Sequence, residues 1–373
     1  MIILLAPDKF KGSLSAQQVC DAISDGIKSI QKETSIIALP LADGGEGTCE
    51  LLTSYSGGSM VDVDVRDPLF RMIRSGYGIS KDGRTAFLEM AKASGLQLLK
   101  KNERNPMVTS TVGTGDLIRH ALDAGVEKII MGIGGSATND GGMGMADALG
   151  MVFNSRSGEK LKPVGENLRH VHSIDRTNEH PKLKSVAFTI FCDVDNPLHG
   201  LNGAAYVFAP QKGATDEMVR QLDEGLVRYE AIVEKVFQRG VNFPGAGAGG
   251  GLPAMVKALT NVVIRPGMDF IIDFIKLEDH VRGSDLIITG EGKIDEQTLS
   301  GKVVRGVADL ARKHNKPVVA ISGKCDLDEA KIRSLNLSKL ITLVDDHTSE
   351  EEAMTNAHAL IRERVAEVIA TWF

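Results

Sequence analysis

Short apolar segments that end in glycine or acidic residues recur at both ends of the 373-residue chain. They read IILLAP (2–7), IIALPLADGG (36–45), DLIITGEG (285–292), PVVAISGK (317–324) and LITLVDD (340–346). Amphipathic helical patterns lie between them, such as residues 15–30, which open on the N-cap residue Ser15. Strands that alternate with helices in this way predict an α/β fold with a parallel, doubly wound sheet.

The middle of the chain has a different pattern. Apolar or alternating segments there predict strands at 60–65, 74–79, 85–90, 128–131, 186–193 and 204–209. Residues 80–84 have the composition of a hairpin turn, and residues 114–125 predict a helix. These elements indicate a mixed sheet with helices on one side. The simplest arrangement inserts this segment, as a domain of residues 58–264, into a first domain built from residues 1–57 and 265–373.

Length and composition narrow the class of protein. A chain of 373 residues exceeds the usual size of one domain, so two domains are expected. The net charge of −6 gives no electrostatic footprint for nucleic acid or anionic lipid, so neither is an expected partner. The four cysteines are typical of reduced thiols in a cytosolic protein. The first apolar segment is too short for a signal peptide or a membrane span, which predicts a soluble, cytoplasmic protein.

A glycine-rich stretch, GIGGSATNDGGMG (132–144), follows the apolar segment 128–131 and precedes a helix predicted over 141–150. Glycines at this position leave backbone N–H groups able to face an anion, and the helix N-terminus adds positive potential. The pattern predicts a phosphate site, although a tight glycine turn that only packs would have the same spacing. The candidate residues are Gly134, Gly135, Ser136, Thr138, Asn139 and Asp140.

Two widespread nucleotide motifs fit this sequence poorly. Residues 132–137 and 245–250 both match GxGxxG/A, but Asn154 stands where a carboxylate should follow the first of them. Three Gly-Lys pairs, at 292–293, 301–302 and 323–324, lack the Ser or Thr and the upstream glycine of a P-loop. A nicotinamide site is therefore disfavoured, and an ATP site would not be of the P-loop type.

Acidic residues and lysines gather just past the predicted strand ends, where open α/β sheets bind ligands. The clusters are Asp8, Lys9 and Lys11; Asp43 and Glu46; Asp193 and Asp195; and Glu291, Lys293 and Asp295. One such cluster is more often a helix cap or a turn, but four in one chain are harder to explain in that way. Carboxylates can hold Mg²⁺ or accept a proton from a hydroxyl, and lysines neutralise phosphoryl charge, as phosphoryl transfer requires. Neither GxSxG nor HExxH occurs, so the sequence shows no machinery of a serine hydrolase or a zinc peptidase.

Six blocks of the sequence resemble the signature blocks of the type 1 glycerate kinase family. They are APDKFKGSLSA, LADGGEGT, GIGGSATNDGG, CDVDNPL, PQKGA and ITGEGKID, which occur in the family's order between residues 6 and 295. The resemblance implies transfer of the γ-phosphoryl group of ATP, with Mg²⁺, to D-glycerate, and in bacterial members a 2-phosphoglycerate product. It also implies a flavodoxin-like domain built from both chain ends, with an inserted domain of mixed sheet.

One block departs from the family pattern. The family often has glycine before PQKG, where this chain has Ala209. Alanine disfavours a positive φ, so an exceptional turn at residue 209 is not expected, whereas Lys212 is unaffected. Position 9 also varies in the family, which favours Lys11 over Lys9 as a functional residue.

The clusters and the resemblance together give a hypothesis for the site, placed in a cleft between the two domains. Residues 134–140 cradle the ATP phosphates. Asp193 is the candidate base for the attacking hydroxyl, with Asp195 as the alternative, and Lys11 is the second catalytic candidate. Lys11 and Lys212 would hold the glycerate carboxylate or the transferring phosphoryl group. The other assignments are Asp8, Lys212, Asp43 and Glu46 for substrate binding and Asp195 and Glu291 for the metal, with Asp8, Asp43 and Glu46 open as further Mg²⁺ ligands.

Two functions of other kinds stay open beside the kinase. One is a sensor that binds a sugar acid or a nucleotide without turnover, which the intact Asp193, Lys11 and glycine blocks disfavour. The other is a nicotinamide-dependent oxidoreductase acting on hydroxy acids, which the missing ribose carboxylate disfavours. The product, the nucleotide preference and the oligomeric state also stay open.

Overall fold

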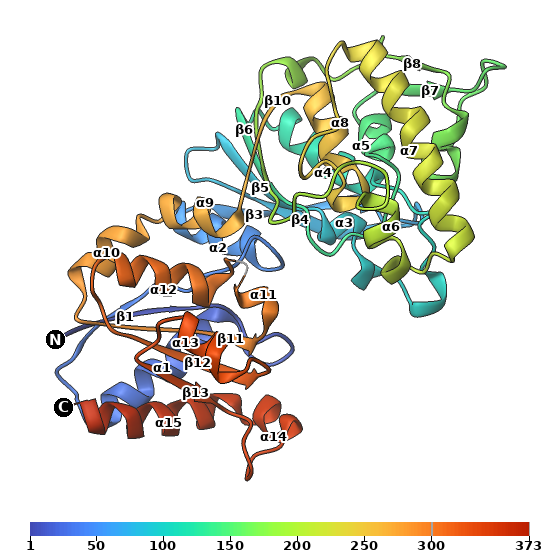
Figure 1. The fold of residues 1–373 in the computed structure, drawn as a ribbon. Coiled ribbons are helices and arrows are strands. Elements are labelled where there is room, and N and C mark those ends of the chain that lie inside the picture. Colours follow the sequence, from blue (N-terminus) through green and yellow to red (C-terminus); the bar gives the residue numbers. More distant parts are fainter. Residues whose placement is uncertain (300, 373) are drawn as a thin grey trace. The chain divides into compact units, whose positions relative to one another are not determined.

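The computed structural model describes residues 1–299 and 301–372. The chain divides into two compact units, each with its own sheet (Figure 1). The terminal unit consists of Met1–Asp43 and Met268–Phe373, and the inserted unit consists of Gly44–Gly267.

The sheet of the terminal unit is parallel throughout. Its strands are β1 (Ile2–Pro7), β2 (Ser35–Ala38), β11 (Leu286–Ile294), β12 (Val318–Cys325) and β13 (Lys339–Thr342). They lie in the order β13-β12-β11-β1-β2, and every pairing is parallel. Numbered within this unit, the order is 2-1-3-4-5, which is that of the flavodoxin-like doubly wound fold. The fold class predicted for the chain ends is therefore confirmed.

Helices cover both faces of this sheet. Helices α1 (Ala16–Ile30) and α15 (Ala357–Trp372) pack side by side on one face, and α10 (Leu277–Gly283) and α12 (Val303–Lys313) lie on the other (Figure 1). Helix α1 begins as predicted, because the Ser15 hydroxyl accepts the Gln18 N–H and the Gln18 side chain accepts the Ser15 N–H. The remaining helices are α9 (Gly267–Phe274), α11 (Glu296–Leu299), α13 (Glu329–Ser334) and α14 (Glu350–Thr355).

The inserted unit contains the predicted mixed sheet. Its strands are β3 (Ser59–Arg66), β4 (Met72–Ile79), β5 (Thr85–Glu89), β6 (Lys128–Gly132), β9 (Ala187–Phe191) and β10 (Asn261–Arg265), in the order β10-β9-β6-β5-β4-β3. Strands β10, β9, β6 and β5 are parallel, whereas β4 and β3 continue the sheet antiparallel. A separate two-stranded ribbon pairs β7 (Val152–Asn154) with β8 (Ser173–Asp175).

One large core holds the helices of the inserted unit against its sheet. These helices are α2 (Thr48–Tyr55), α3 (Ala91–Ser94), α4 (Val112–Asp123), α5 (Met143–Ala148), α6 (Ala204–Phe208), α7 (Asp216–Phe237) and α8 (Leu252–Leu259). The strand predicted over 204–209 was wrong, because this segment forms α6, with Val207 and Ala209 donating their N–H groups to Gly203 and Ala205. A short apolar run does not distinguish a strand from a buried helical turn by its pattern alone.

The segment 44–57 belongs to the inserted unit, whereas the sequence analysis grouped it with the chain ends. Segment 44–57 belongs to this unit because it contains helix α2, which packs against the mixed sheet. The Cys49 N–H donates to the Glu89 carboxylate at 2.8 Å, at the end of β5. Thr53 packs against Gly78 of β4 so closely that a β-carbon at residue 78 would lie 1.6 Å from the Thr53 hydroxyl oxygen. These contacts tie α2 to the mixed sheet.

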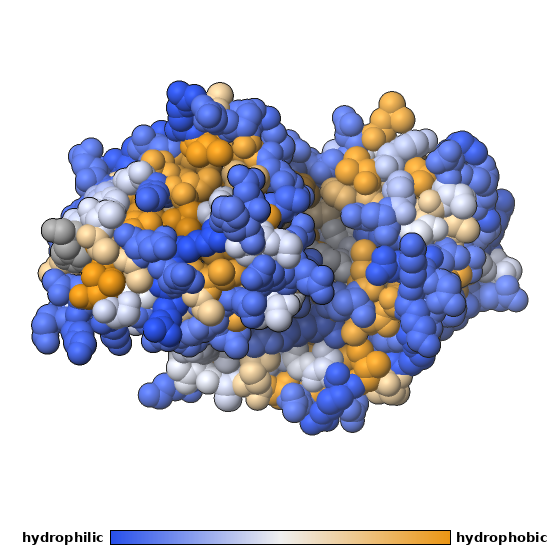
Figure 2. Space-filling model, turned by 90° about the horizontal axis from the view of Figure 1, so that it is seen from below, coloured by the Kyte–Doolittle hydropathy of each residue, from blue (hydrophilic) through white to orange (hydrophobic). Residues whose placement is uncertain are grey.

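Within residues 1–299 and 301–372, no helix combines the length and the apolar character needed to cross a membrane. The face drawn in Figure 2 is mostly hydrophilic, and its hydrophobic residues form separate patches. Single large apolar side chains such as Leu201 and Met72 are exposed, which is normal for a protein surface.

Candidate active site

Three acidic residues lie at the carboxyl edge of the parallel sheet in the terminal unit. Asp8 directly follows β1, Asp43 follows β2, and Glu291 lies in β11. Strands β1 and β11 pair with Pro7 opposite Gly290, so Asp8 and Glu291 occupy the next positions of adjacent strands. This is the point of the 2-1-3-4-5 sheet where the connections change direction, and such points are where doubly wound folds bind ligands.

The negative charges of Asp8 and Glu291 are poorly stabilised. Burial, followed by the negative charges of Asp43 and Glu291, raises the pKa of Asp8 to about 7, against the hydrogen bond that the Lys9 N–H donates to it. Burial also raises the pKa of Glu291 to about 7, against the hydroxyl of Thr298 and the charge of Lys302. A proton or a cation would therefore bind favourably beside this pair.

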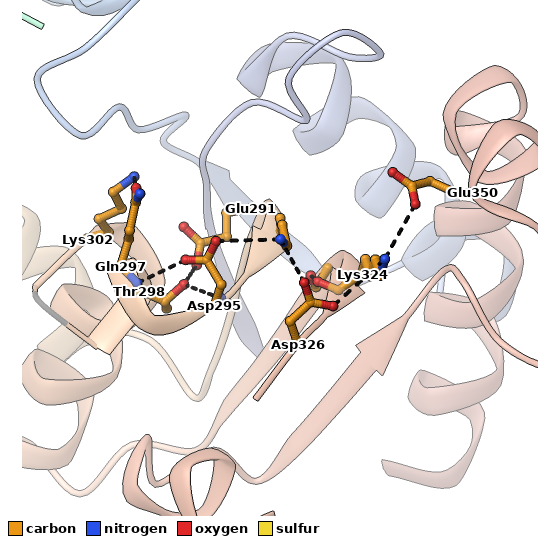
Figure 3. A network of polar contacts seen from close by, with 10 residues as sticks. Glu291, Asp295, Gln297, Thr298, Lys302, Lys324, Asp326 and Glu350 are labelled. Atoms are coloured by element: carbon orange, nitrogen blue, oxygen red, sulfur yellow. Dashed lines mark hydrogen bonds and ion pairs between the residues drawn. The ribbon is translucent and has the colours of Figure 1, made fainter. Parts of the chain in front are cut away.

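All three Gly-Lys pairs of the sequence bring a lysine to this edge, and Figure 3 labels two of them, Lys302 and Lys324. The Lys302 ammonium lies 3.5 Å from the Asp43 carboxylate and donates to the side chain of Gln297 at 2.8 Å. Lys293 and Lys324 face each other across β11 and β12, and both pair with Asp326, at 2.7 and 3.9 Å. Lys302 was not among the predicted site residues, although a Gly-Lys pair just before a helix was the available signal.

Lys11 belongs to the same edge. Its backbone packs against Gly292, where a β-carbon would lie 3.1 Å from the Lys11 nitrogen. The Lys11 side chain is exposed. The terminal unit therefore gathers four of the predicted site residues, namely Asp8, Lys11, Asp43 and Glu291.

The glycine-rich loop of the inserted unit connects β6 to α5. Gly134 and Gly135 are exposed, Ser136 is 6% exposed, and Thr138, Asn139 and Asp140 are completely buried. Gly135 has φ +71°, a conformation that favours glycine. A ligand above this loop would therefore meet Gly134, Gly135 and the edge of Ser136, while the side chains of the last three residues lie below.

Asp140 fastens the loop to the helices around it. Its carboxylate accepts hydrogen bonds from the Thr111 N–H at 2.7 Å and the Thr111 hydroxyl at 2.8 Å. It also accepts the N–H groups of Gly142 at 3.2 Å and Gly144 at 3.1 Å. Burial raises the pKa of Asp140, and these four hydrogen bonds oppose that shift. Asp140 thus joins the starts of α4 and α5 to the end of the loop.

Lys212 contacts the loop from inside the protein. It ends a short 3-10 helix, Pro210–Lys212, and is only 2% exposed. Its ammonium donates to the Ser136 hydroxyl oxygen at 2.8 Å and to the Thr138 carbonyl at 2.7 Å. Burial lowers the pKa of Lys212 to about 7, against the attraction of Asp140. The backbone turns at Gly213, with φ +95°, while Ala209 has φ −70°, so this turn does not need glycine at residue 209.

The carboxyl ends of β5, β6 and β9 bring further groups together in the inserted unit. Glu89, at the end of β5, is 3% exposed and holds the start of α2 through the Cys49 N–H. Glu89 was not among the predicted site residues, although TAFLEM has a carboxylate at the end of an apolar strand. Gly132, opposite Glu89 in the sheet, contacts the Gly44 carbonyl so closely that a β-carbon would lie 2.4 Å from it.

The remaining predicted residues also lie in the inserted unit. Asp193 follows β9, is exposed, and accepts the Gly267 N–H at 3.0 Å. Asp195 and Glu46 are exposed in the segments after β9 and before α2. The predicted site residues therefore form two sets, one at the carboxyl edge of each sheet, and the two metal candidates Asp195 and Glu291 belong to different units.

A glycine loop after a parallel strand, together with buried carboxylates and lysines at a sheet's carboxyl edge, has the components of a phosphoryl-transfer enzyme. Comparison with known proteins places the chain more narrowly. Residues 3–373 match the model of the glycerate kinase family. The chain belongs to this family, and the resemblance found in the sequence is confirmed.

Curated relatives align over almost their whole length. A glycerate kinase of Bacillus cereus is 42% identical over 100% of this chain and 98% of its own, and a glycerate 2-kinase of Escherichia coli K12 is 40% identical with the same coverage. A crystal structure of a candidate glycerate kinase 2 from Salmonella typhimurium LT2 is 42% identical, covers 100% of this chain and 98% of its own, and superposes with a TM-score of 0.89. These relatives carry the names of phosphotransferases, which confirms the predicted enzyme class.

The four hydrogen bonds to the Asp140 carboxylate predict that this residue stabilises the fold. Replacing Asp140 with Asn should lower the free energy of unfolding by about 2 kcal/mol, because an amide has one acceptor oxygen for the four donors and its NH₂ group would face an N–H. The measurement is urea unfolding followed by circular dichroism, with amide hydrogen exchange of α4 and α5. Asp175→Asn is the matched control, since Asp175 accepts two similar bonds from Thr177 in an exposed position and its loss should leave the transition in place. An Asp140→Asn protein as stable as its parent would contradict this role.

Proposed function

We propose that this protein is an ATP- and Mg²⁺-dependent kinase that phosphorylates D-glycerate to 2-phosphoglycerate. The whole-chain match to the glycerate kinase family carries the proposal, and the name of the Escherichia coli relative supports position 2 as the acceptor. The two sets of site residues supply the parts that such a reaction needs: a backbone surface for phosphates, carboxylates for proton transfer and metal binding, and lysines for charge neutralisation.

The glycine loop is our candidate for the phosphate site. Gly134 and Gly135 expose backbone without side chains, and Ser136 adds a hydroxyl at the rim. A triphosphate can approach such a surface closely. Thr138, Asn139 and Asp140 would contribute by fixing the loop, since their side chains are buried beneath it.

Asp193 is our candidate general base. It would take the proton of the glycerate hydroxyl while that oxygen attacks the γ-phosphorus and the bond from the γ-phosphorus to the bridging oxygen of ADP breaks. A carboxylate has several lone pairs, so accepting a hydrogen bond from Gly267 does not by itself prevent Asp193 from accepting this proton. Asp195 is the alternative base. Lys11 is exposed at the edge that holds Asp8 and Asp43, and we assign it to the glycerate carboxylate or the transferring phosphoryl group.

The residues of the terminal unit fit Mg²⁺. Among residues 1–299 and 301–372, no three acidic, histidine or cysteine side chains form a ready-made metal centre. Mg²⁺ does not require one, because it is commonly held by one or two carboxylates together with substrate phosphates and water. Glu291 and Asp8 are hard oxygen donors whose charge is destabilised by burial, and they would hold the ion with Asp43 nearby. The bound ion would neutralise charge on the phosphates.

The proposed activity can be measured directly. Purified protein with D-glycerate and Mg·ATP should release ADP in a coupled assay, and phosphorus NMR should give the 2-phosphoglycerate resonance. Controls lack glycerate or contain EDTA. Binding of ATP without ADP release would instead indicate a sensor, and a 3-phosphoglycerate resonance would overturn the proposed position.

The proposed role of Asp193 as the general base can be tested by substitution. Asp193→Asn should lower kcat by about 10²–10⁴-fold while the protein stays folded, because the amide cannot accept the hydroxyl proton. Asp62→Asn, an exposed substitution on β3 of the same unit, is the control and should leave kcat unchanged. Full activity of the Asp193 variant would move the role to Asp195, to be tested by the equivalent substitution.

The proposed role of the glycine loop in phosphate binding can be tested at Gly134. No atom lies within 4 Å of a β-carbon built on Gly134, so Gly134→Ala should fold normally. Its methyl group would occupy the space that phosphates need, and we expect the KM for ATP to rise about tenfold, or ~1.4 kcal/mol. Gly283→Ala, a helix-terminal position with equally open space, is the control. An unchanged KM for ATP would place the phosphates elsewhere.

A further inference from the structure

Lys212 lies beneath the glycine loop rather than on its surface. The side chain is 2% exposed, and two of the three N–H donors of its ammonium are used on the Ser136 hydroxyl oxygen and the Thr138 carbonyl. Both acceptors belong to the loop that follows β6. Direct contact with a substrate above Gly134 and Gly135 is therefore not the natural role of this lysine.

The hydrogen bond to Ser136 has a defined direction. An ammonium has no lone pair, so Lys212 donates and the Ser136 oxygen accepts. The Ser136 hydroxyl must then point its own proton away from Lys212. Ser136 is at the rim of the buried region, next to the exposed Gly134 and Gly135, where that proton can meet a ligand. A charged donor on the oxygen also polarises the O–H group and strengthens the bond it makes.

We propose that Lys212 is a positioning residue that acts through Ser136, orienting and polarising its hydroxyl as a donor to a phosphoryl oxygen bound over Gly134 and Gly135. The inference rests on the proposed function, since it needs phosphates at this loop. It replaces the direct substrate contact that the sequence suggested for Lys212. The positive charge also acts on the anion across the loop, where little water intervenes to screen it.

The surroundings of Lys212 make its charge sensitive to a bound anion. Asp140 faces it from the loop, Tyr229 faces Asp140 from α7, and the backbone of Arg104 packs against Gly213. Burial lowers the pKa of Lys212 to about 7, so near neutral pH the free protein holds this proton only partly. A phosphate above the loop favours the protonated form. Nucleotide affinity should therefore be highest below pH 7 and fall as the pH rises through the pKa of Lys212.

The test measures Mg·ATP binding by isothermal titration calorimetry between pH 6 and 9. The proteins are the parent, Lys212→Met, Ser136→Ala and the double variant. Each single substitution should raise the Kd about tenfold at pH 6.5, and the double variant should be weaker than the parent by clearly less than the product of the two effects. Less-than-additive loss is the signature of one residue acting through the other.

The pH dependence of the Kd distinguishes the effect of the Lys212 charge from that of the Ser136 hydroxyl. The Kd of the parent should rise about tenfold between pH 6.5 and pH 8.5, whereas Lys212→Met should lose this rise. Ser136→Ala keeps the ammonium but lacks the hydroxyl through which it acts, so it should keep only part of the rise, with weaker binding throughout. Protonation of ATP itself is common to all the proteins and cancels in the ratio of variant to parent. A role of Lys212 in packing alone would not change the shape of the profile.

Lys182→Met is the matched control. The Lys182 ammonium also donates to a backbone carbonyl, that of Leu122 at 2.7 Å. This contact lies at the amino ends of the strands, away from the glycine loop. This substitution should leave both the Kd and its pH dependence unchanged. Thermal melting checks that every variant is folded.

Several results would overturn the inference. A folded Lys212→Met protein with the parent's Kd and pH profile would do so, as would additive effects in the double variant. If Lys212→Met does not fold, Ser136→Ala decides, and a Kd equal to the parent's overturns the proposal. Failure of the parent to bind Mg·ATP is a different result, since it removes the proposed function and the inference with it.

Discussion

A buried ammonium and a buried carboxylate hold the glycine loop of the inserted unit from the inside. Lys212 bonds to Ser136 and Thr138, and Asp140 bonds to the starts of two helices. Buried charges are costly unless they are well hydrogen-bonded, so such groups persist where they fix a particular backbone shape. Here that shape leaves Gly134 and Gly135 as bare backbone at the surface. The loop can face an anion because the charges that support it are kept below.

The terminal unit also contains buried charged groups near the end of a sheet, but its sheet rather than a loop positions them. Its parallel sheet places the ends of β1 and β11 next to each other, and with them Asp8 and Glu291. Lys302 pairs with Asp43 and partly offsets the effect of burial on Glu291, while Lys293 and Lys324 pair with Asp326 at the ends of β11 and β12. In each unit the candidate site residues lie near the ends of parallel strands, the position where open α/β sheets bind ligands.

Much of this could be predicted from the pattern of residues. The alternation of apolar strands and amphipathic helices predicted the doubly wound sheet, and the segments 60–65, 74–79 and 85–90 with a hairpin turn at 80–84 predicted the mixed sheet. The misses have a common cause. The segment 204–209 forms a helix that buries Ala204, Ala205 and Ala209 in the core, and α2 packs on the inserted sheet through Glu89, so tertiary packing decides between local patterns of equal quality. Lys302 was missed because its partner Asp43 is far away in sequence.

The sequence by itself determined the family, the fold class and the identity of the polar clusters, because these depend on local periodicity and on motifs that are contiguous along the chain. Only the tertiary structure decided which members of each cluster face solvent. Gly134 and Asp140 are six positions apart in one motif, yet the first is exposed and the second completely buried. The difference arises from elements distant in sequence, α4 and the turn at Lys212, whose hydrogen bonds reach the loop only after the chain has folded.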